Sequence, residues 1–261
     1  MESRIFDELR EIVGPRGLIT SRDELHTYEC DGLTNFRLLP RAVLLPDSTE
    51  QVQKIVRVCH RDKIPFVARG SGTGLSGGAL PVENGVVISL TRMNRILEVD
   101  FANARVVVEP GVINLDVTGR VAPQEYFYAP DPSSQSICSI GGNVAENSGG
   151  AHCLKYGFTT THVLGLEVVL ADGSLVHLGG KTLDAPGYDL MGVFVGSEGT
   201  LGIATKIILR VVKRPECART LLAAFPSTNE AGAAVSDTIA AGMLPAIKAM
   251  KLEPVAALRH E

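Results

Sequence analysis

The feature that most constrains this chain is the glycine-rich segment 69–79, which follows the short apolar run Ile64–Ala68. Five of the nine residues from Gly70 to Gly78 are glycines. Glycine adopts positive φ without a steric penalty and leaves no Cβ in the way of a ligand. Successive N–H groups of such a loop can point into one concavity and bind an anion such as a pyrophosphate. The segment therefore predicts a phosphate-binding loop at the end of a strand.

Two familiar nucleotide motifs fit this loop poorly. Residues 72–77 give one G-x-G-x-x-G match, but a Rossmann site needs a helix directly after it. Pro81 and the turn signal Asn84-Gly85 predict that no helix follows. A nucleotide triphosphatase loop is disfavoured because the G-K-[ST] ending is missing. A glycine-rich turn without a ligand remains the alternative for this loop taken alone.

Composition narrows the function classes. Of the 261 residues, 45% are hydrophobic and 21% are charged, which is typical of a globular protein. The net charge of −4 gives no case for nucleic-acid binding. No apolar run approaches the roughly 20 residues that a membrane-spanning helix needs, and the acidic first residues argue against a targeting peptide. We therefore expect a cytoplasmic protein without an integral membrane segment.

The five cysteines are scattered and contain no C-x-x-C pair, so the sequence predicts no zinc or iron–sulfur site and no other metal. Cys59 falls on the apolar face of an expected helix and is interpreted as a small core residue. The odd number of cysteines suits a reducing compartment.

Hydrophobic patterns predict an α+β fold. Ser48 and Gln51 form a capping box that begins a helix, and this helix joins two strands into a βαβ unit from whose end the glycine loop leaves. The turn signal Asp172-Gly173 predicts a hairpin. The expected strands cover residues 42–46, 64–68, 86–90, 96–99, 106–109, 161–170, 175–178 and 201–212, and a short helix covers 113–121.

The chain is predicted to have three parts. Residues 1–35 are a helical lead-in, 36–215 form the main domain, and 216–261 are the start of an incomplete α+β domain. In this last part we expect a strand over 220–225, a helix capped by Ser227 to Glu230, and helical structure over 248–261.

Two further segments resemble the first loop in composition. They are 129–150, with Gly141-Gly142, and 196–203, which is also glycine-rich. Asn143, Asn147 and Ser148 could donate hydrogen bonds to a carbonyl, a ring nitrogen or a phosphate. Each segment alone is compatible with simple turn chemistry, but three such loops at the ends of apolar elements favour a shared ligand.

Six motifs occur in a fixed order, at residues 69–74, 130–132, 140–143, 147–150, 155–157 and 196–202. Together they make the chain resemble the FAD-linked oxidases of the vanillyl-alcohol oxidase (PCMH) type. Among these it is most similar to the FAD-binding subunit of glycolate oxidase and to D-lactate dehydrogenases. The segment Tyr28–Leu33 is also similar to the start of that glycolate oxidase chain, and the resemblance runs from about residue 20 to about 245.

This resemblance implies a PCMH-type FAD-binding domain of two α+β subdomains, with an incomplete substrate (cap) domain after it. Some relatives attach FAD to a histidine in the first loop, where this chain has serines, so non-covalent FAD is expected. The resemblance assigns FAD contacts to Gly70, Ser71, Gly72, Thr73, Gly74, Ser76, Gly77, Pro130, Asp131, Ser134, Gly141, Gly142, Asn143, Ser148, Gly149, Gly150, Glu198, Gly199 and Ile203.

The implied reaction is FAD-dependent oxidation of a 2-hydroxy acid, glycolate or D-lactate, to the 2-oxo acid. Catalytic residues stay unassigned, because the family's histidines come mainly from later segments and only His260 follows His177 here. Arg37 and the segment Tyr28–Leu33 are candidates for the substrate side, and His152 is interpreted as structural or peripheral. Implied partners are further flavin and iron–sulfur subunits, which could hold the chain at the inner face of a membrane.

Two other functions remain open. The chain could be a non-catalytic FAD-binding module or a truncated remnant of an enzyme. A cell-wall reductase of the UDP-N-acetylmuramate type uses similar loops, but the motifs at 130–132 and 196–202 argue against it.

Overall fold

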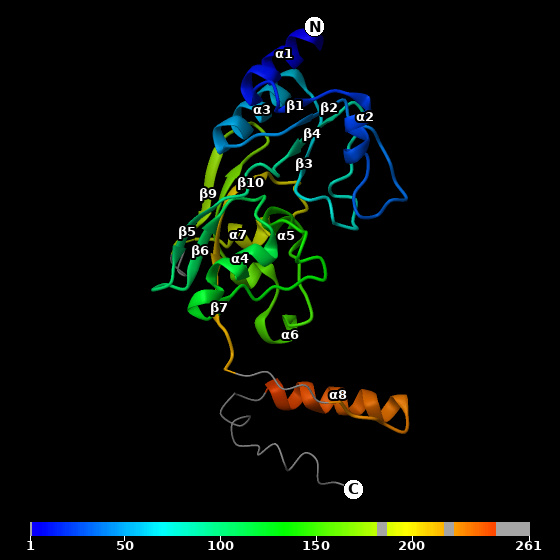
Figure 1. Cartoon of the computed structure of the whole chain (residues 1–261), viewed down its shortest axis with the longest axis vertical. Coiled ribbons are helices and arrows are strands. Elements are labelled where there is room, and N and C mark those ends of the chain that lie inside the picture. The colour runs from blue at the N-terminus through cyan, green and yellow to red at the C-terminus, as the bar shows by residue number, and fades with distance from the viewer. Residues whose placement is uncertain (1, 182–186, 217–221, 244–261) are drawn as a thin grey trace. The chain divides into compact units, whose positions relative to one another are not determined.

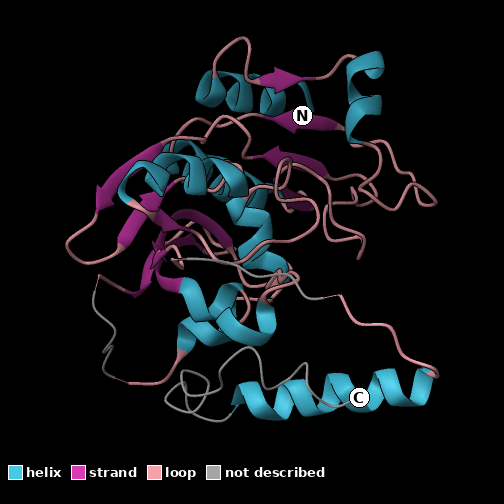
Figure 2. Cartoon of the chain, turned by 60° about the horizontal axis from the view of Figure 1, so that its bottom comes forward, coloured by secondary structure: helices cyan, strands magenta, loops and turns pink. Residues whose placement is uncertain are grey.

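The computed structural model describes residues 2–181, 187–216 and 222–243, and the chain divides into two units, Met1–Arg214 and Pro215–Glu261. The described residues of the first unit form two main sheets, seen as separate groups of magenta strands in Figure 2, and a third sheet of only two strands. Its mixture of separate sheets and helices is the α+β fold that the sequence predicts.

The first sheet has the strand order β1-β2-β4-β3, in which β2, β4 and β3 are parallel and β1 is antiparallel to β2. Its strands are β1 (Leu18–Ile19), β2 (Ala42–Leu44), β3 (Phe66–Arg69) and β4 (Val86–Ser89). The βαβ unit is confirmed, with β4 lying between its two strands. Helices α1 (Glu2–Val13) and α3 (Thr49–Asp62) pack on this sheet (Figure 1), whereas α2 (Arg22–Leu25) and the 3₁₀ turn η1 (His26–Tyr28) lead towards β2.

Helix α3 begins as predicted. Ser48 lies just before it, and its Oγ accepts a hydrogen bond from the Gln51 N–H at 3.4 Å. The Gln51 side chain accepts from the N–H of Asp47 at 2.9 Å, one residue earlier than in the standard capping box. Cys59 is 1% exposed in the core under this helix, and burial raises the pKa of its thiol to about 12. The interpretation of Cys59 as a core residue is confirmed.

The second sheet is antiparallel, with the order β5-β6-β10-β8-β9, and a short pair joins β11 to β7. Helices α4, α5 and α7 lie beside this sheet (Figure 1). The strands are β5 (Ile96–Asp100), β6 (Arg105–Val108), β7 (Tyr126–Phe127), β8 (Val163–Val169), β9 (Leu175–Gly179), β10 (Ile203–Arg210) and β11 (Val212–Lys213). The helices are α4 (Asn114–Val121), α5 (Ile140–Glu146), α6 (Cys153–Tyr156) and α7 (Leu190–Phe194), with 3₁₀ turns η2 (Ala122–Gln124) and η3 (Thr159–His162).

The predicted hairpin is present between β8 and β9. The N–H of Leu170 donates to the carbonyl of Ser174 at 2.9 Å, and Gly173 takes a φ of +80° in the turn. The expected strand over 161–170 begins later, at Val163, because Thr161 and His162 belong to η3.

Residues 1–35 share the core of the first unit, because β1 pairs with β2 and α1 packs on α3. In the second unit, α8 (Thr228–Met243) follows Ser227, whose Oγ accepts from the Glu230 N–H at 3.3 Å, as the capping pattern predicts. The strand expected over 220–225 is wrong for Leu222–Phe225, which form no strand. Leu222 is fully exposed and pairs with no strand among the described residues. Residues 220–221 and the helix expected over 248–261 lie outside the described residues.

Candidate functional site

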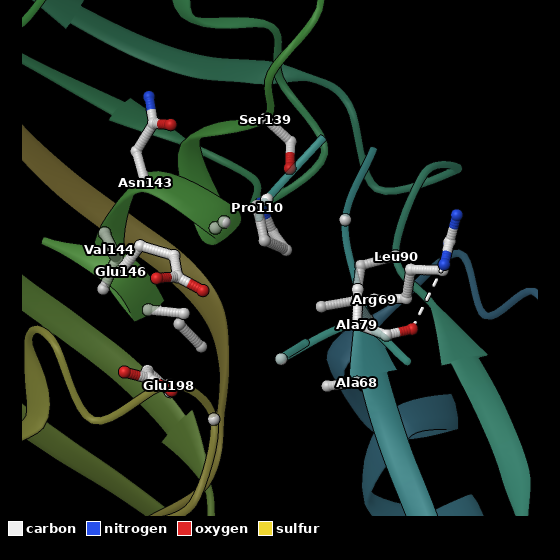
Figure 3. Close-up of a pocket in the computed structure, with 18 of the residues that line it drawn as sticks. Ala68, Arg69, Ala79, Leu90, Pro110, Ser139, Asn143, Val144, Glu146 and Glu198 are labelled. Atoms are coloured by element: carbon white, nitrogen blue, oxygen red, sulfur yellow. Dashed lines mark hydrogen bonds between the residues drawn. The ribbon is translucent and has the colours of Figure 1, made fainter. Parts of the chain in front are cut away.

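A pocket in the first unit lies between the end of β3 and the helix α5, and its two walls face each other in Figure 3. The space between these walls, including the part that is open to solvent, has a volume of ≈ 1000 Å³. All three glycine-rich segments contribute to it. The predicted residues that line it are Gly70, Ser71, Gly72, Thr73, Gly74, Ser134, Gly141, Gly142, Asn143, Ser148, Glu198, Gly199 and Ile203.

Six predicted residues are not among those that line this pocket: Ser76, Gly77, Pro130, Asp131, Gly149 and Gly150. The Pro130 carbonyl accepts from the Asn114 side chain at 3.1 Å, and Asp131 holds the His152 ring at 2.6 Å. These contacts support the second loop. Direct contact of these six residues with a ligand stays a prediction.

The structure adds lining residues that the motifs did not single out as ligand contacts. They include Arg69, Gly78 and Ala79, which lie within the predicted loop 69–79, and also Pro110, Cys138, Ser139, Glu146 and Ser197. Glu146 could have been found from the sequence. It lies four residues after Gly142, so the two share one face of an α-helix, and Figure 3 shows its carboxylate directed into the space between the walls.

The first loop offers free backbone donors. The N–H groups of Gly72, Thr73 and Gly74 line the pocket and have no acceptor within the described part of the chain. Gly72 takes a φ of +70°, which turns the backbone so that neighbouring N–H groups can converge. On the opposite wall, the Gly142 N–H also lacks an acceptor among the described residues. A run of unpaired N–H groups is the arrangement that binds phosphate oxygens.

Arg69 places a positive charge behind this loop. Its side chain is buried, donates to the carbonyls of Cys30 at 2.7 Å and Ala79 at 3.1 Å, and lies 5.7 Å from the Tyr28 ring centroid. Burial lowers the pKa of this guanidinium, and none of its described contacts is with a carboxylate. Because a buried charge is costly without a counter-charge, an anion in the pocket would be stabilised here.

The segment Tyr28–Leu33 holds the first loop through hydrogen bonds to the loop backbone. The Gly32 N–H donates to the Gly74 carbonyl at 2.9 Å, and the Asp31 carboxylate accepts from the Gly77 N–H at 2.8 Å. Arg37, in contrast, pairs with Glu29 at 2.7 Å and its side chain is 61% exposed. This segment therefore contacts the glycine loop, and Arg37 does not line the pocket.

Glycine is required where the walls approach each other. A Cβ on Gly70 would collide with the Ser139 hydroxyl, which also accepts from the Ser71 N–H at 3.3 Å. A Cβ on Gly141 would lie 2.6 Å from the Pro110 Cβ. These positions hold two backbone segments close together and leave the space between them open for a flat or extended ligand.

The third loop caps the C-terminal end of α5 by donating hydrogen bonds to its last carbonyls. The N–H groups of Gly196 and Glu198 donate to the carbonyls of Val144 at 2.9 Å and Ala145 at 2.8 Å. Glu198 has a φ of +54°, unusual for a residue with a side chain. Such strain persists only where the surroundings fix it, and it occurs often at ligand sites.

The polar side chains of the second loop have mainly structural contacts. Asn147 accepts from the Thr160 N–H at 2.9 Å, and the Ser148 carbonyl accepts from the Thr159 hydroxyl at 2.7 Å. The Asn143 side chain points away from the opposite wall (Figure 3), and its buried Nδ2 has no partner among the described residues. The free backbone N–H groups of the first loop and of Gly142 therefore remain available in the pocket, which fits the pyrophosphate of an extended dinucleotide.

Solved structures share this architecture. The chain matches alkyldihydroxyacetonephosphate synthase with a TM-score of 0.75 and 25% identity, over 82% of this chain and 41% of that one. It matches p-cresol methylhydroxylase with a TM-score of 0.71 and 25% identity, over 83% of this chain and 44% of that one. The fold is therefore of the PCMH type that the sequence predicts.

The chain is also similar in sequence to several curated proteins. The chain is 50% identical over 237 residues to glycolate oxidase subunit GlcD of Escherichia coli K12, covering 91% of this chain and 48% of the relative. It is 45% identical over 243 residues to GlcD of Bacillus subtilis 168, covering 93% and 52%. A D-lactate dehydrogenase of Anaerostipes hadrus is 37% identical over 234 residues, covering 88% and 49%. The chain spans about half the length of the curated relatives that it matches.

The family comparison covers the first two of the three loops that line the pocket. Residues 40–179, more than half of the chain, match the FAD binding domain family. This range contains the phosphate-type loop after β3 and the whole of α5, and the pocket between them has the free N–H groups and the close backbone approach that a dinucleotide needs. The chain belongs to the FAD binding domain family.

Proposed function

We propose that this chain is the FAD-binding part of an enzyme that oxidises a 2-hydroxy acid, glycolate or D-lactate, to the 2-oxo acid. The observation that carries the proposal is the pocket in which three glycine loops meet around the unpaired N–H groups of Gly72, Thr73 and Gly74. The relatives named glycolate oxidase subunit and D-lactate dehydrogenase support the substrate class.

Bound FAD would supply the hydride acceptor for the substrate α-carbon. The residues of this chain bind and orient it. The unpaired N–H groups of the first loop and of Gly142 would hold the pyrophosphate, and the buried Arg69 charge behind the loop would stabilise the anion. The remaining predicted contacts, from Pro130 to Gly150 and from Glu198 to Ile203, would lie along the rest of the cofactor.

We propose that FAD is held without a covalent bond. The pocket has no lining histidine in the described part of the chain, and Ser71 stands in the first loop where some relatives carry one. Denaturing the loaded protein with acid should release all of the flavin into the supernatant. Flavin that stays with the precipitate would contradict this, and the buried Cys138 in the pocket wall would then be the attachment site to test.

The partners and location are proposals by likeness to glycolate oxidase subunits. We propose that further flavin and iron–sulfur subunits complete the enzyme and that the complex works in the cytoplasm or at the inner face of a membrane. No helix in the described residues is both long and apolar enough to cross a bilayer.

The second candidate function is a non-catalytic FAD-binding module. It is favoured by the pocket lining itself, whose free backbone N–H groups are suited to holding a cofactor. The pocket would then hold FAD without turning over a substrate.

One experiment separates these functions. The purified chain is reconstituted with FAD, and its absorption spectrum is recorded without oxygen before and after glycolate or D-lactate is added, with L-lactate as the matched control. Flavin absorbance that bleaches with glycolate or D-lactate but not with L-lactate supports the enzyme. A yellow protein that never bleaches supports the non-catalytic module, and a colourless protein contradicts both.

A further inference from the structure

A side-chain hydrogen bond joins the tip of the first loop to α5. The Ser76 hydroxyl donates to the Glu146 carboxylate at 2.7 Å, although the residues are 70 positions apart in the sequence. Ser76 is exposed at the loop tip, whereas Glu146 is half-buried and lines the pocket. We refer to this pair as the loop clasp.

The loop is held on one side by its own subdomain. Asp31 and Gly32 bind the backbone of Gly77 and Gly74, and these four residues lie on the side of the first sheet. Contacts of this kind fix the base of the loop but do not cross the pocket.

Two described hydrogen bonds link the first loop to the wall formed by α5 and the residue before it. One joins the Ser71 N–H to the Ser139 hydroxyl at 3.3 Å, near the start of the loop. The other is the loop clasp, at its far end. Gly72 to Gly74, which carry the free N–H groups, lie between these two hydrogen bonds. The segment that would face the ligand is therefore flanked on both sides by a hydrogen bond to the α5 wall.

Glycines near the loop tip leave space for the Glu146 carboxylate. A Cβ on Gly78 would lie 3.2 Å from the Glu146 Oε1, and a Cβ on Gly74 would lie 3.6 Å from it. The carboxylate therefore lies against the loop backbone on both sides of Ser76. Its position next to the phosphate-type loop is otherwise unfavourable, because a carboxylate repels an anion.

We propose that the loop clasp positions the tip of the first loop over the bound cofactor and sets the rate at which FAD leaves. The inference rests on the proposed FAD-binding function and adds a positioning role for Ser76 and Glu146. For FAD to enter or leave between the two walls, the hydroxyl of Ser76 separates from the carboxylate and the loop tip moves away from α5.

The test measures FAD dissociation from the reconstituted chain as the rise in flavin fluorescence after rapid dilution. Ser76→Ala and Glu146→Ala should each raise the dissociation rate about fivefold, as expected for one partly exposed hydrogen bond to a charged group. The double variant should be no faster than either single variant, because both remove the same contact. Ser136→Ala, at an exposed serine outside the pocket lining, is the matched control and should leave the rate unchanged.

Glu146→Gln separates the hydrogen bond from the charge. Both substitutions at Glu146 remove the repulsion between its carboxylate and the phosphates, but only the glutamine amide oxygen can still accept from Ser76, so Glu146→Gln should release FAD more slowly than Glu146→Ala. Three results would overturn the proposed role of the loop clasp. The single variants could release FAD at the unaltered rate, or their effects could multiply in the double variant. The third is a Glu146→Gln dissociation rate equal to that of Glu146→Ala. An unaltered chain that fails to bind FAD would instead overturn the proposed function, and the clasp with it.

Discussion

Gly141 and Gly142 are neighbours in α5, yet an added methyl group should act on them in opposite ways. Both line the pocket, and both have backbone angles that alanine can adopt. What differs is the space around each Cβ. We predict that Gly141→Ala destabilises the chain, whereas Gly142→Ala slightly stabilises it and weakens FAD binding.

The magnitudes follow from the surrounding atoms. A Cβ on Gly141 would lie 2.6 Å from the Pro110 Cβ and 3.0 Å from its carbonyl oxygen. Neither atom is on a flexible side chain, so we expect a loss of about 2 kcal/mol, typical of overpacking. A Cβ on Gly142 has the Ser139 hydroxyl as its nearest neighbour, at 3.3 Å. A small movement of that side chain accommodates it, and alanine gains about 0.5 kcal/mol near a helix start.

The same methyl group on Gly142 projects into the pocket. The Gly142 nitrogen lies 3.7 Å from the position of a Cβ on Gly70, so the two walls nearly meet here. A methyl group at this point takes space from the ligand and shields a free N–H. We expect FAD to bind about tenfold more weakly, equivalent to ~1.4 kcal/mol.

The assay has two parts on the same three proteins. Urea denaturation of the FAD-free chains gives the free energy of unfolding, and titration with FAD gives the dissociation constant from the quenching of flavin fluorescence. Each variant is the control for the other, because the added group is identical and the sites are adjacent. The reasoning is refuted if both variants shift the free energy of unfolding in the same direction, or if Gly142→Ala binds FAD as tightly as the unaltered chain.

Three further predictions concern other parts of the first unit. Burial lowers the pKa of His162 below its ordinary value, so the neutral ring is favoured in the folded chain, while the unfolded chain takes up a proton near pH 6.5. The free energy of unfolding should therefore be highest above pH 6.5 and fall as the pH drops below it, and His162→Gln should flatten this dependence in urea titrations at pH 8 and 5.5. Arg69→Met removes the charge behind the first loop and should weaken FAD binding about tenfold, with a smaller effect in high salt. Ser48→Ala removes the cap of α3 and should lower the free energy of unfolding by about 1 kcal/mol, measured by urea denaturation.

The elements that were predicted correctly are those fixed by near neighbours in the sequence. The cap of α3 depends on Ser48 and Gln51, and the hairpin depends on the turn at Asp172-Gly173. In each case the hydrogen bonds of the cap or turn join residues within a few positions of one another, so a short sequence pattern is enough to predict the element. The glycine loops were found for the same reason.

Contacts between distant segments could not be predicted in this way. Periodicity places Glu146 on the same helix face as Gly142 but does not say that Ser76 lies opposite. The strand expected near Leu222 failed because strand residues need a partner that supplies the ladder, and the sequence alone does not show whether one exists. Residues 1–35 likewise join the first sheet through a strand of two residues, β1, too short to give a pattern.

The position of α5 explains why the three loops form one site. Its start is tied to the first loop through Ser139, and its last carbonyls are capped by the N–H groups of Gly196 and Glu198 in the third loop. The helix is itself part of the second loop, which spans residues 129–150. A shift of α5 therefore displaces the pocket lining of the second loop together with its contacts to the other two loops. A substitution at Gly196, although Gly196 does not line the pocket, should weaken FAD binding by releasing the end of α5, and its effect should not add to that of a change within the helix.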